Sequence, residues 1–568
     1  MQILKNTAAE LVSAAASDLF APATLTADEV RTMLEYPPDG SMGDLALPCF
    51  KLSKSLRRSP MEIASKLAEK LSHPAFASIE AVGGYLNFKK DAAIFASRVV
   101  NTVLEKGDAY GAPALGEGKT VVLDYSSPNV AKPFHIGHLG TTVIGHSLKL
   151  LHEFAGYKCV GINHLGDWGT QFGKLIVAYK KWGNREEIEE KEIDALVALY
   201  VRFHAEAEKD ESLNDEARAM FARLEQHDEE CMALWRWFIE ISLREYNKTY
   251  RMLGITFDSY NGESFYTDKM PAEIEKIRKA GILEIDDGAS VVNLEKWNMP
   301  PCLILKRDGS TLYPTRDIAA AVYRKNTYDF EKCIYVTSAG QCLHFAQWFK
   351  VLEMMGYDWY DGLVHVPYGT VSIGGEKLAT RTGNVILLKD LFRQAIDKVK
   401  GIMKEKNTAA GDDVAEKVGV GAIIFYYLSN NRMRDINFVM EDALSFDGNT
   451  GPYAQYTYAR TCSLLEKAGD AGKSASLLAM TAEEAELSLV LSRFPETVTN
   501  AIAEYEPSII TRYILDLCAA FNRFYHECQI LSAEDASVRE NRLAFTRAVK
   551  TVLGRALSLI CMPTPEKI

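Results

Sequence analysis

Two histidines that lie close together in the chain are the strongest local signal for chemistry. His135 and His138 end the string Asn129-Val-Ala-Lys-Pro-Phe-His-Ile-Gly-His138, and Gly137 between them leaves room for a flat ring to approach the backbone. Side chains three positions apart at a helix start share one face, about 5–6 Å apart. Two imidazoles at the positive end of a helix suit a phosphate that gains charge in a transition state. Local packing or a metal site are the alternatives, although the motif has no acidic or cysteine third ligand.

A basic segment lies much further along the chain. Glu376-Lys-Leu-Ala-Thr-Arg-Thr-Gly-Asn384 follows a strand-like run at 365–373 and precedes a helix predicted from about Leu388. As a loop near 377–384, it could bring Lys377 and Arg381 to a triphosphate and neutralise departing pyrophosphate. Taken alone, the segment would be interpreted as a solvated basic loop. Together with the histidine string, it favours a function in phosphate chemistry.

The elements around the histidines predict a nucleotide-binding α/β unit. Lys119-Thr-Val-Val-Leu-Asp124 is a strand-like run, a polar break follows at 126–129, and a helix pattern begins near Gly137. The string Gly116-Glu-Gly-Lys-Thr120 resembles the end of a P-loop, but it precedes a strand and the required earlier glycine is Pro113. We therefore interpret it as part of a linker.

Patterns along the rest of the chain divide it into three regions. The first mixes helices and strands; it includes a helix start at Ser59-Pro60 and a glycine turn that leads into a strand at 81–88. Short strands are predicted at 290–292, 302–305 and 333–336, and residues of about 185–250 are helical and strongly charged. We interpret the charge run Glu186–Glu190 as a solvated helix face. From about Gly451 onward the pattern is helical.

Composition narrows the class of protein. The chain has 568 residues, with 76 acidic and 64 basic side chains and a net charge of −12, and its length suggests three or four domains of about 100–200 residues. The 47% hydrophobic and 25% charged content is that of a globular protein, which excludes collagen-like, mucin-like and wholly disordered chains. The acidic balance argues against a polycation that coats nucleic acid, but it does not exclude a local basic track.

Sequence features also predict the compartment. No run approaches the roughly 18 apolar residues of a membrane span, and Glu10 and Asp18 interrupt any N-terminal signal-peptide pattern. The ten cysteines form no CxxC pair, so we expect reduced thiols and a cytoplasmic protein.

The histidine string and the basic segment together resemble the signature pair of class I aminoacyl-tRNA synthetases. The longer strings are similar to those of the arginyl-tRNA synthetase family in particular. The matching strings are Ser126–Leu139, Asn163–Phe172, Gln341–Phe345 and Gly451–Arg460. They run from the first third of the chain into its last region, so the resemblance covers essentially the whole sequence.

The resemblance implies a fold class and a domain organisation. The expected fold is α/β, with a Rossmann-type catalytic core, an appended N-terminal α+β domain and an all-helical C-terminal anticodon-binding domain. We place the N-terminal domain, expected to contact the tRNA elbow, at residues 1–115. The catalytic domain takes 116–450, with the helical insertion at about 185–250, and the anticodon-binding domain takes 451–568.

The resemblance also implies an activity and its partners. The chain is expected to ligate L-arginine to the 3′ end of tRNA(Arg) through arginyl-adenylate, using ATP and Mg²⁺, with activation that requires bound tRNA. It is expected to act as a cytoplasmic monomer with no membrane association. A class I synthetase for another amino acid and a catalytically silent tRNA-binding paralogue are the competing hypotheses.

Site residues follow from the resemblance position by position. The implied catalytic residues are His135, His138, Lys132, Lys377 and Arg381, of which His135, His138 and Lys377 bind ATP together with Gly137. The implied arginine-binding residues are Asp124, Asn129, His135, Tyr313, Asp317 and Gln341. A guanidinium prefers a planar carboxylate partner, which suits the tyrosine–aspartate pair. The implied tRNA-binding residues are Tyr453, Gln455, Tyr456 and Arg460.

Alternatives and departures accompany these assignments. Taken singly, Asp317 would be a helix cap or a surface acid, Tyr313 would be core packing, and packing also holds for some of the four tRNA-binding residues. Thr380 stands where many class I enzymes have a second lysine, whose charge Lys132 is expected to supply. Gly140 stands where the family usually has arginine, and the sequence offers no physical account of that change.

Overall fold

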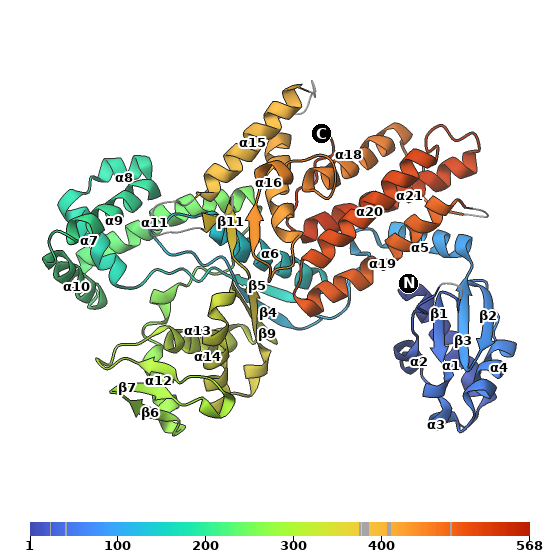
Figure 1. Ribbon diagram of the computed structural model, residues 1–568, viewed down its shortest axis with the longest axis horizontal. Helices are drawn as coiled ribbons and strands as arrows, with labels where there is room; N and C mark the ends of the chain where they lie inside the picture. The colour runs from blue at the N-terminus through green and yellow to red at the C-terminus, as the bar shows by residue number, and fades with distance from the viewer. Residues whose placement is uncertain (23, 40–41, 374–375, 378–385, 406–410, 477–479) are drawn as a thin grey trace.

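The chain forms a central body with lobes at both ends. The structure is a computed structural model that describes residues 1–568 except 23, 40–41, 374–375, 378–385, 406–410 and 477–479. In Figure 1 the N-terminal segment (blue) forms a lobe beneath the C-terminal helices (red), and the middle of the chain (green) extends to the opposite side.

A four-stranded parallel sheet lies at the centre, in the order β10-β9-β4-β5. Its strands are β4 (Thr120–Asp124), β5 (Lys158–Ile162), β9 (Lys332–Ser338) and β10 (Leu363–Tyr368). From β4 the chain passes first to β5 on one side and later to β9 on the other. The carboxyl ends of β4 and β9 therefore meet at a topological switch point, where open α/β sheets bind their ligands.

Each face of this sheet packs against a separate hydrophobic core. Val121 and Leu123 belong to the core that includes α6 (Leu139–Phe154), whereas Val122 belongs to the core with α13 (Tyr313–Tyr328) and α14 (Cys342–Met354). Successive side chains of a strand point to opposite faces, so a strand that is covered on both sides needs an uninterrupted apolar run. The predicted strand that ends in Asp124 is confirmed.

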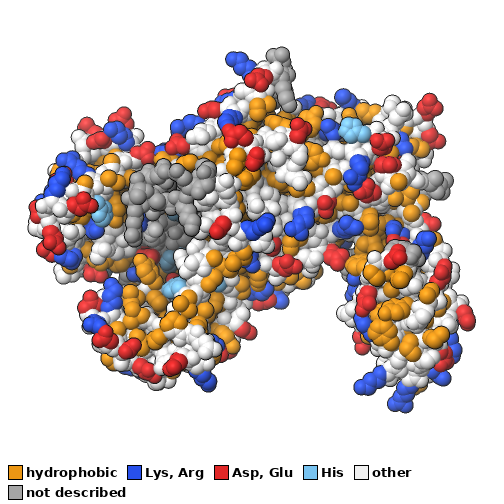
Figure 2. Space-filling model, in the orientation of Figure 1, with side chains coloured by type: hydrophobic (Ala, Val, Ile, Leu, Met, Phe, Trp, Pro, Cys, Tyr) orange, Lys and Arg blue, Asp and Glu red, His pale blue; other side chains and the backbone are white. Residues whose placement is uncertain are grey.

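Two insertions separate β5 from β9. The helical insertion consists of α7 (Thr170–Trp182), α8 (Arg185–Lys191), α9 (Ile193–Ala207), α10 (Ser212–Glu225) and α11 (Glu229–Met252), which share their own core. The acids of Glu186–Glu190 are exposed and Ile188 is buried, which confirms a solvated helix face. Figure 2 shows acidic and basic side chains mixed over this lobe.

The second insertion is a small antiparallel sheet beside α13. It contains α12 (Met270–Lys279), β6 (Leu283–Asp286), β7 (Ala289–Val292) and β8 (Cys302–Leu305). The strands predicted at 290–292, 302–305 and 333–336 are confirmed as parts of β7, β8 and β9. Short 3-10 helices are η2 (Cys49–Lys51), η3 (Gly107–Ala109), η4 (Ile136–His138), η5 (Glu263–Tyr266), η6 (Glu295–Trp297), η7 (Ala339–Gln341) and η8 (Asp358–Gly362).

A third sheet follows the central one in the chain. It pairs β11 (Val371–Ile373) with β12 (Glu376–Lys377) and β13 (Ile436–Phe438), so the strand-like run predicted at 365–373 is two strands. The helices here are α15 (Leu388–Glu405), α16 (Asp412–Leu428) and α17 (Met440–Ala443). The helix predicted from about Leu388 is confirmed.

The N-terminal lobe combines helices with an antiparallel sheet in the order β1-β3-β2. Its elements are α1 (Gln2–Leu19), α2 (Ala27–Met33), β1 (Leu45–Pro48), α3 (Ser53–Leu56), α4 (Pro60–Lys70), β2 (Phe76–Val82) and β3 (Tyr85–Lys90). Helix α5 (Ala92–Lys106) follows in the chain and lies beside the C-terminal helices (Figure 1). The predicted helix start is confirmed, because Ser59 caps α4 by accepting a hydrogen bond from the backbone of Glu62.

Helices alone make up the described C-terminal elements. They are α18 (Gly451–Ala468), α19 (Ala482–Glu504), α20 (Ser508–Glu527) and α21 (Ala536–Leu559), and α5 packs against α19 and α21 (Figure 1). The predicted α/β fold class, with an α+β N-terminal part and a helical C-terminal part, is confirmed. Of the helices in the described residues, none is long and apolar enough to cross a membrane.

Candidate active site

A cavity of about 480 Å³ opens at the switch point of the central sheet. Six residues that the sequence singled out line it: Asp124, Asn129, His138, Tyr313, Asp317 and Gln341. They come from the end of β4, the loop after it, the end of η4, the start of α13 and the end of η7. The fold thus brings together side chains that lie more than two hundred positions apart in the chain. His135, Gly137 and Lys132 are not among the lining residues of this cavity.

The histidine pair sits at a helix start, as predicted. η4 leads directly into α6, and the ring centroids of His135 and His138 are 4.0 Å apart. The backbone N–H of His135 donates to Nδ1 of His138 at 3.2 Å, and that of Gly137 donates to Nδ1 of His135 at 3.0 Å. Nδ1 of His135 accepts, so the proton of its neutral ring is on Nε2. Nδ1 of His138 also lies 3.3 Å from the carbonyl of His135, so it accepts in one tautomer and donates in the other.

Burial keeps both rings neutral. It lowers the pKa of His135 to about 4 and, together with the neighbouring His135, lowers that of His138 to about 3. The pair therefore brings two neutral imidazoles rather than two positive charges to a phosphate. Lys132 is exposed, and its charge lowers the pKa of His138 further.

Strained backbone shapes the segment between β4 and the histidines. Ser126, Ser127 and Ala131 have φ angles of 71°, 47° and 58°, in the left-handed region that non-glycine residues rarely adopt. The inner face of α11 holds this segment. Ser242 accepts from the backbone N–H of Ala131 at 3.0 Å, and the hydroxyl of Tyr250 lies 2.7 Å from that of Ser126.

The arginine pocket expected from the resemblance contains three acids, each beside a basic side chain. Asp317 Oδ2 lies 2.6 Å from Nε2 of His344. Glu263 is 2.8 Å from the guanidinium of Arg316, and burial raises its pKa to about 7. Tyr313, the first residue of α13, is 66% exposed, so it is not core packing and its side chain is accessible at the cavity wall.

The third acid has an internal partner. Asp124 Oδ2 lies 2.8 Å from the guanidinium of Arg324, whose side chain is 1% exposed, and Asp124 also accepts from Ser127 Oγ at 2.8 Å. Removing one partner of a buried ion pair leaves the other charge uncompensated, at a cost of about 3–5 kcal/mol. Asp124 thus lines the cavity, and its ion pair with the buried Arg324 holds the carboxylate in place.

The structure explains Gly140, which departs from the usual family sequence. A Cβ atom at this position would overlap the hydroxyl of Tyr427 and lie 2.9 Å from its Cζ and 3.0 Å from Cε2 of Tyr368. Both tyrosines come from outside the histidine motif, on α16 and β10. Their rings fill the space that a side chain at residue 140 would need.

The second signature segment is described only at its start. Lys377 is the last residue of β12 and pairs with Ser372 of β11. The predicted role of Arg381 falls outside the described residues, as does the position of Thr380.

Three of the four predicted tRNA-binding residues share a partly exposed patch on α18. The Arg460 guanidinium lies 5.1 Å from the Tyr456 ring and 4.7 Å from that of Tyr525 on α20, and Asn522 donates to the Tyr453 hydroxyl at 2.9 Å. Gln455 is different. It is fully buried, and its amide donates to the carbonyls of Lys417 at 3.0 Å and Pro563 at 2.9 Å. We therefore assign Gln455 to anchoring the C-terminal segment rather than to RNA contact.

Several cavity residues were not singled out from the sequence. His344 lies inside the recognised string Gln341–Phe345, and Arg316 directly precedes Asp317, so proximity to a singled-out residue was the available signal. Glu263 lies in no recognised string, and only the fold brings it to Arg316.

Comparison with known proteins assigns the chain to a family. Residues 99–440 match the family described as tRNA synthetases class I (R), catalytic domain; 454–568 match the DALR anticodon binding domain, and 6–89 match the arginyl tRNA synthetase N terminal domain. The fold and site are thus those of a class I aminoacyl-tRNA synthetase.

Individual relatives make the assignment more specific. The arginine–tRNA ligase of Alkaliphilus metalliredigens is 50% identical over 95% of this chain and 96% of its own length, and that of Clostridium perfringens is 49% identical over 96% and 97%. The chain belongs to the arginyl-tRNA synthetase family. Its fold is similar to that of Thermus thermophilus arginyl-tRNA synthetase, with a TM-score of 0.81 at 24% identity and complete coverage of both chains.

Proposed function

We propose that this chain ligates L-arginine to the 3′ end of its cognate tRNA through arginyl-adenylate, as an enzyme of protein synthesis. Membership of class I implies that ATP drives the reaction. The observation that carries the proposal is the cavity at the switch point, which the histidine motif and the acids Asp124, Glu263 and Asp317 line together. Three carboxylates around one space suit a substrate with a guanidinium side chain.

The proposed chemistry needs positioning more than covalent catalysis. The arginine carboxylate attacks the α-phosphate of ATP, the bond to the bridging oxygen breaks, and pyrophosphate leaves. A terminal ribose hydroxyl of tRNA then attacks the activated carbonyl, and AMP leaves. His135 and His138 would donate Nε2–H hydrogen bonds to phosphate oxygens, and Lys132, Lys377 and Arg381 would neutralise charge.

Residue roles in substrate binding are part of this proposal. Asp317 and Tyr313 would bind the guanidinium, and Asn129, Gln341, Asp124 and His135 would hold the backbone atoms of arginine. Gly137 would let the ATP base or ribose approach closely. Tyr453, Tyr456 and Arg460 would contact unstacked anticodon bases, since RNA bases are read by stacking on aromatic rings and arginine planes.

We propose Mg²⁺ as a counterion that enters with ATP. Among the described residues, no group of three or more His, Cys, Asp or Glu side chains is arranged to hold a metal ion. Mg²⁺ is commonly bound through substrate phosphates and retains several waters. The residues present therefore fit a cation that the nucleotide carries, rather than one in a protein cage.

Domain limits, location and assembly remain proposals. We keep the division into 1–115, 116–450 and 451–568, a monomer and a cytoplasmic location. All ten cysteines are free, the state that a reducing compartment maintains, and this supports the location. Light scattering of the purified chain tests the monomer.

Aminoacylation of bulk tRNA with labelled arginine tests the function. We expect labelled tRNA to accumulate with arginine, and ATP–pyrophosphate exchange to require both arginine and tRNA. Exchange that is absent with arginine even when tRNA is present would contradict the proposal. Exchange with a different amino acid would favour another class I synthetase, and no exchange with any would favour a silent paralogue.

A further inference from the structure

One turn of α11 contacts the segment that leads into the histidine pair. The buried hydroxyl of Tyr246 lies 2.8 Å from the carbonyl oxygens of Asn129 and Lys132, and its ring packs on Phe134 at a centroid distance of 5.2 Å. Tyr246 is thus bonded to the segment that precedes His135. Since that segment includes strained residues, it needs external contacts to keep its shape.

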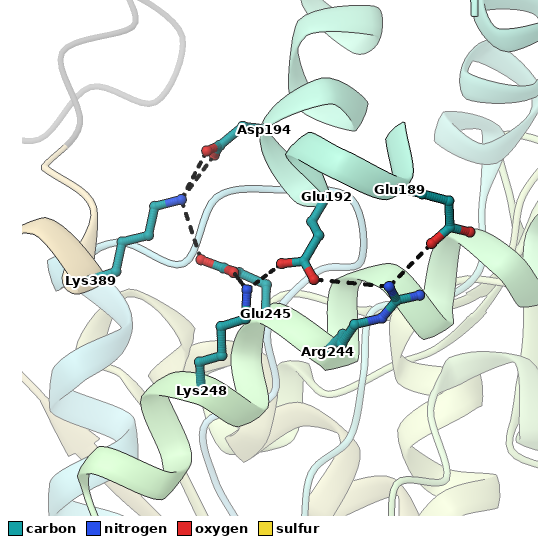
Figure 3. Close-up of polar contacts among 7 residues, drawn as sticks. All are labelled: Glu189, Glu192, Asp194, Arg244, Glu245, Lys248 and Lys389. Carbon is teal, nitrogen blue, oxygen red and sulfur yellow. Dashed lines mark hydrogen bonds and ion pairs between the residues drawn. The ribbon is translucent and has the colours of Figure 1, made fainter. Parts of the chain in front are cut away.

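The outer edge of the same turn carries an ionic network (Figure 3). Lys389, at the start of α15, lies 2.9 Å from Asp194 and 3.3 Å from Glu245. Lys248 binds Glu245 at 3.0 Å and also Glu192. Figure 3 shows Lys389 pointing from α15 toward side chains of α9 and α11, so the network ties three helices together.

The start of α15 is in turn bonded to the histidine motif. The backbone N–H of Ile136 donates to the carbonyl of Ile386 at 3.2 Å, and the N–H of Leu388 donates to the carbonyl of Phe134 at 2.9 Å. A cavity of about 10 Å³ lies between these elements, next to Phe134 and Lys389. Lys389, Glu245 and Lys248 also line a larger cavity, of about 480 Å³. Lys389 therefore acts on the same backbone that Tyr246 holds directly.

We propose that Tyr246 and Lys389 are positioning residues for adenylate formation, and that α11 of the helical insertion sets the geometry of the histidine pair. The inference rests on the proposed function. Tyr246 holds the carbonyls of Asn129 and Lys132, which precede His135. Lys389 holds the start of α15, whose backbone is hydrogen-bonded to the residues on both sides of His135. Neither side chain lines the cavity at the switch point, so each acts through the backbone that carries the imidazoles.

We expect these residues to affect the rate of adenylate formation, because the motif contributes the positions of the His135 and His138 rings. A misplacement of about 1 Å in a positioned group can cost a large factor in rate. Removing the Tyr246 hydroxyl takes this buried donor from the carbonyls of Asn129 and Lys132, and an acceptor that is left unsatisfied costs about 1–3 kcal/mol. A half-exposed ion pair such as Lys389–Asp194 contributes less to the stability of the local structure, about 1 kcal/mol at most.

The first test is Tyr246→Phe, which keeps the ring. We expect kcat for arginine-dependent ATP–pyrophosphate exchange to fall about tenfold, with a smaller change in the KM for arginine, because Tyr313 and Asp317 lie on α13 and only Asn129 of the arginine-binding residues is bonded to Tyr246. Tyr513→Phe is the matched control: its buried hydroxyl donates to the carbonyl of Val490 at 3.2 Å, within the C-terminal helices. An unchanged kcat for Tyr246→Phe, or an equal loss in the control, would overturn the role of Tyr246.

The second test removes the charge of Lys389. We expect Lys389→Met to lower kcat about three- to fivefold and Lys389→Arg to restore it, while Lys398→Met has no effect. Lys398 lies on the same helix but pairs with Glu441. In a double-mutant cycle with Asp194→Asn, the second change should cost little once the first is made. Equal losses of kcat in Lys389→Met and Lys398→Met would overturn the specific role of Lys389, because any positive charge on α15 would then serve.

These outcomes are distinguishable from failure of the proposed function. The parent chain is assayed first for arginine-dependent exchange and charging. If the parent fails, the function is wrong; if the parent is active and both positioning variants equal it, the function stands and the inference is wrong.

Discussion

The neutral state of His135 and His138 decides how the motif works at the scale of single residues. Burial lowers both pKa values to about 4 and about 3, so near pH 7 neither ring contributes a positive charge. The rings offer directed hydrogen bonds, which can strengthen as charge develops on a phosphate without attracting ATP strongly beforehand. Charge neutralisation is left to lysine and arginine side chains.

The role of Asp317 gives the first prediction. Asp317→Asn should raise the KM for arginine about 10- to 100-fold, because a charge-assisted hydrogen bond to a guanidinium is worth about 1.5–3 kcal/mol. The KM for ATP should stay within about twofold. Steady-state exchange kinetics measure both constants, with Asp329→Asn as control on the exposed end of the same helix. An unchanged KM for arginine would contradict the assignment.

Glu263 should make arginine binding depend on pH. Burial raises the pKa of this carboxyl to about 7, with Arg316 opposing the shift and Asp167 and Asp317 adding to it. A guanidinium binds the ionised form, so the KM for arginine should fall as pH rises from 6 to 8. Glu263→Gln should flatten this profile. A parent profile that is already flat over this range would argue against a role for Glu263.

The raised pKa of Glu263 also makes the stability of the fold depend on pH. Here a rise in pH is unfavourable, whereas it favours arginine binding. The folded state holds this proton more tightly than the unfolded chain, whose carboxyl has a pKa of 4.5. Its contribution to stability is therefore fully present below pH 4.5 and is lost as pH rises through about 7. Chemical denaturation of the parent and of Glu263→Gln at pH 5 and pH 8 isolates this contribution.

Gly140 offers a prediction about packing. Gly140→Ala should lower the free energy of unfolding by about 1–3 kcal/mol, since its Cβ would overlap the hydroxyl of Tyr427. Adding Tyr427→Phe should recover part of the lost stability, because it removes the overlapping hydroxyl. The recovery should be incomplete, because Cζ of residue 427 and the ring of Tyr368 stay close to the new Cβ. Urea denaturation of the two single variants and the double variant measures the coupling. Additive losses would show that the two positions do not compete for space.

Elements differ in how much of their role local sequence predicts. Strand β4, the cap of α4 and the start of α18 follow from apolar runs and capping residues, so their prediction needed only a few neighbouring positions. The attachments of α11 could not be predicted in this way. Tyr246 bonds to residues more than 110 positions earlier, and no local pattern marks which face of a charged helix will meet them.

The site shows the same division between local and distant information. His135 and His138 were singled out because their string is specific, and Asp317 because of the resemblance that this string supports. Arg324 was not, because a lone arginine in a helix gives no sign that it will lie buried beneath Asp124. The partner of a buried charge is decided by tertiary packing, which the sequence of one chain does not display.

Helix α18 gives a prediction that separates two of its neighbouring residues. Gln455→Ala should lower the free energy of unfolding by about 1–3 kcal/mol, because the carbonyls of Lys417 and Pro563 lose a donor whose side chain is fully buried. Tyr456→Ala should leave stability nearly unchanged and raise the KM for tRNA about tenfold, as one lost stacking contact is worth about 1–3 kcal/mol. Denaturation and aminoacylation kinetics measure both. If Gln455→Ala instead raised the KM for tRNA and left stability unchanged, Gln455 would be assigned to RNA contact.

For the whole molecule, net charge is a poor guide to the partner. The chain carries −12, yet it belongs to a family that acts on a polyanion. The exposed acids of Glu186–Glu190 lie on the helical insertion, where both signs of charge are mixed (Figure 2). What matters for RNA is where the basic side chains lie, because their attraction falls off within about 8–10 Å at physiological salt.

Salt should therefore weaken tRNA binding in spite of the negative net charge. The logarithm of affinity falls by about 0.7–0.9 per contacted phosphate for each tenfold rise in salt, so two contacts predict about a tenfold loss between 50 and 200 mM KCl. Filter binding across this range measures the slope, and the KM for arginine in the same buffers is the control. A tRNA affinity that is constant or rises with salt would contradict local basic contacts.

The bond between Ser147 and Leu559 bears on how the chain is made. Ser147 Oγ, on the helix that the histidine motif begins, donates to the carbonyl of Leu559 at 2.7 Å across 412 positions. At about 5–20 residues per second, a ribosome needs roughly 20–80 s to synthesise that interval. During this time α6 lacks its C-terminal neighbour and exposes part of an apolar face. The packing of α6 against the C-terminal segment is thus among the last contacts to form as each molecule is synthesised.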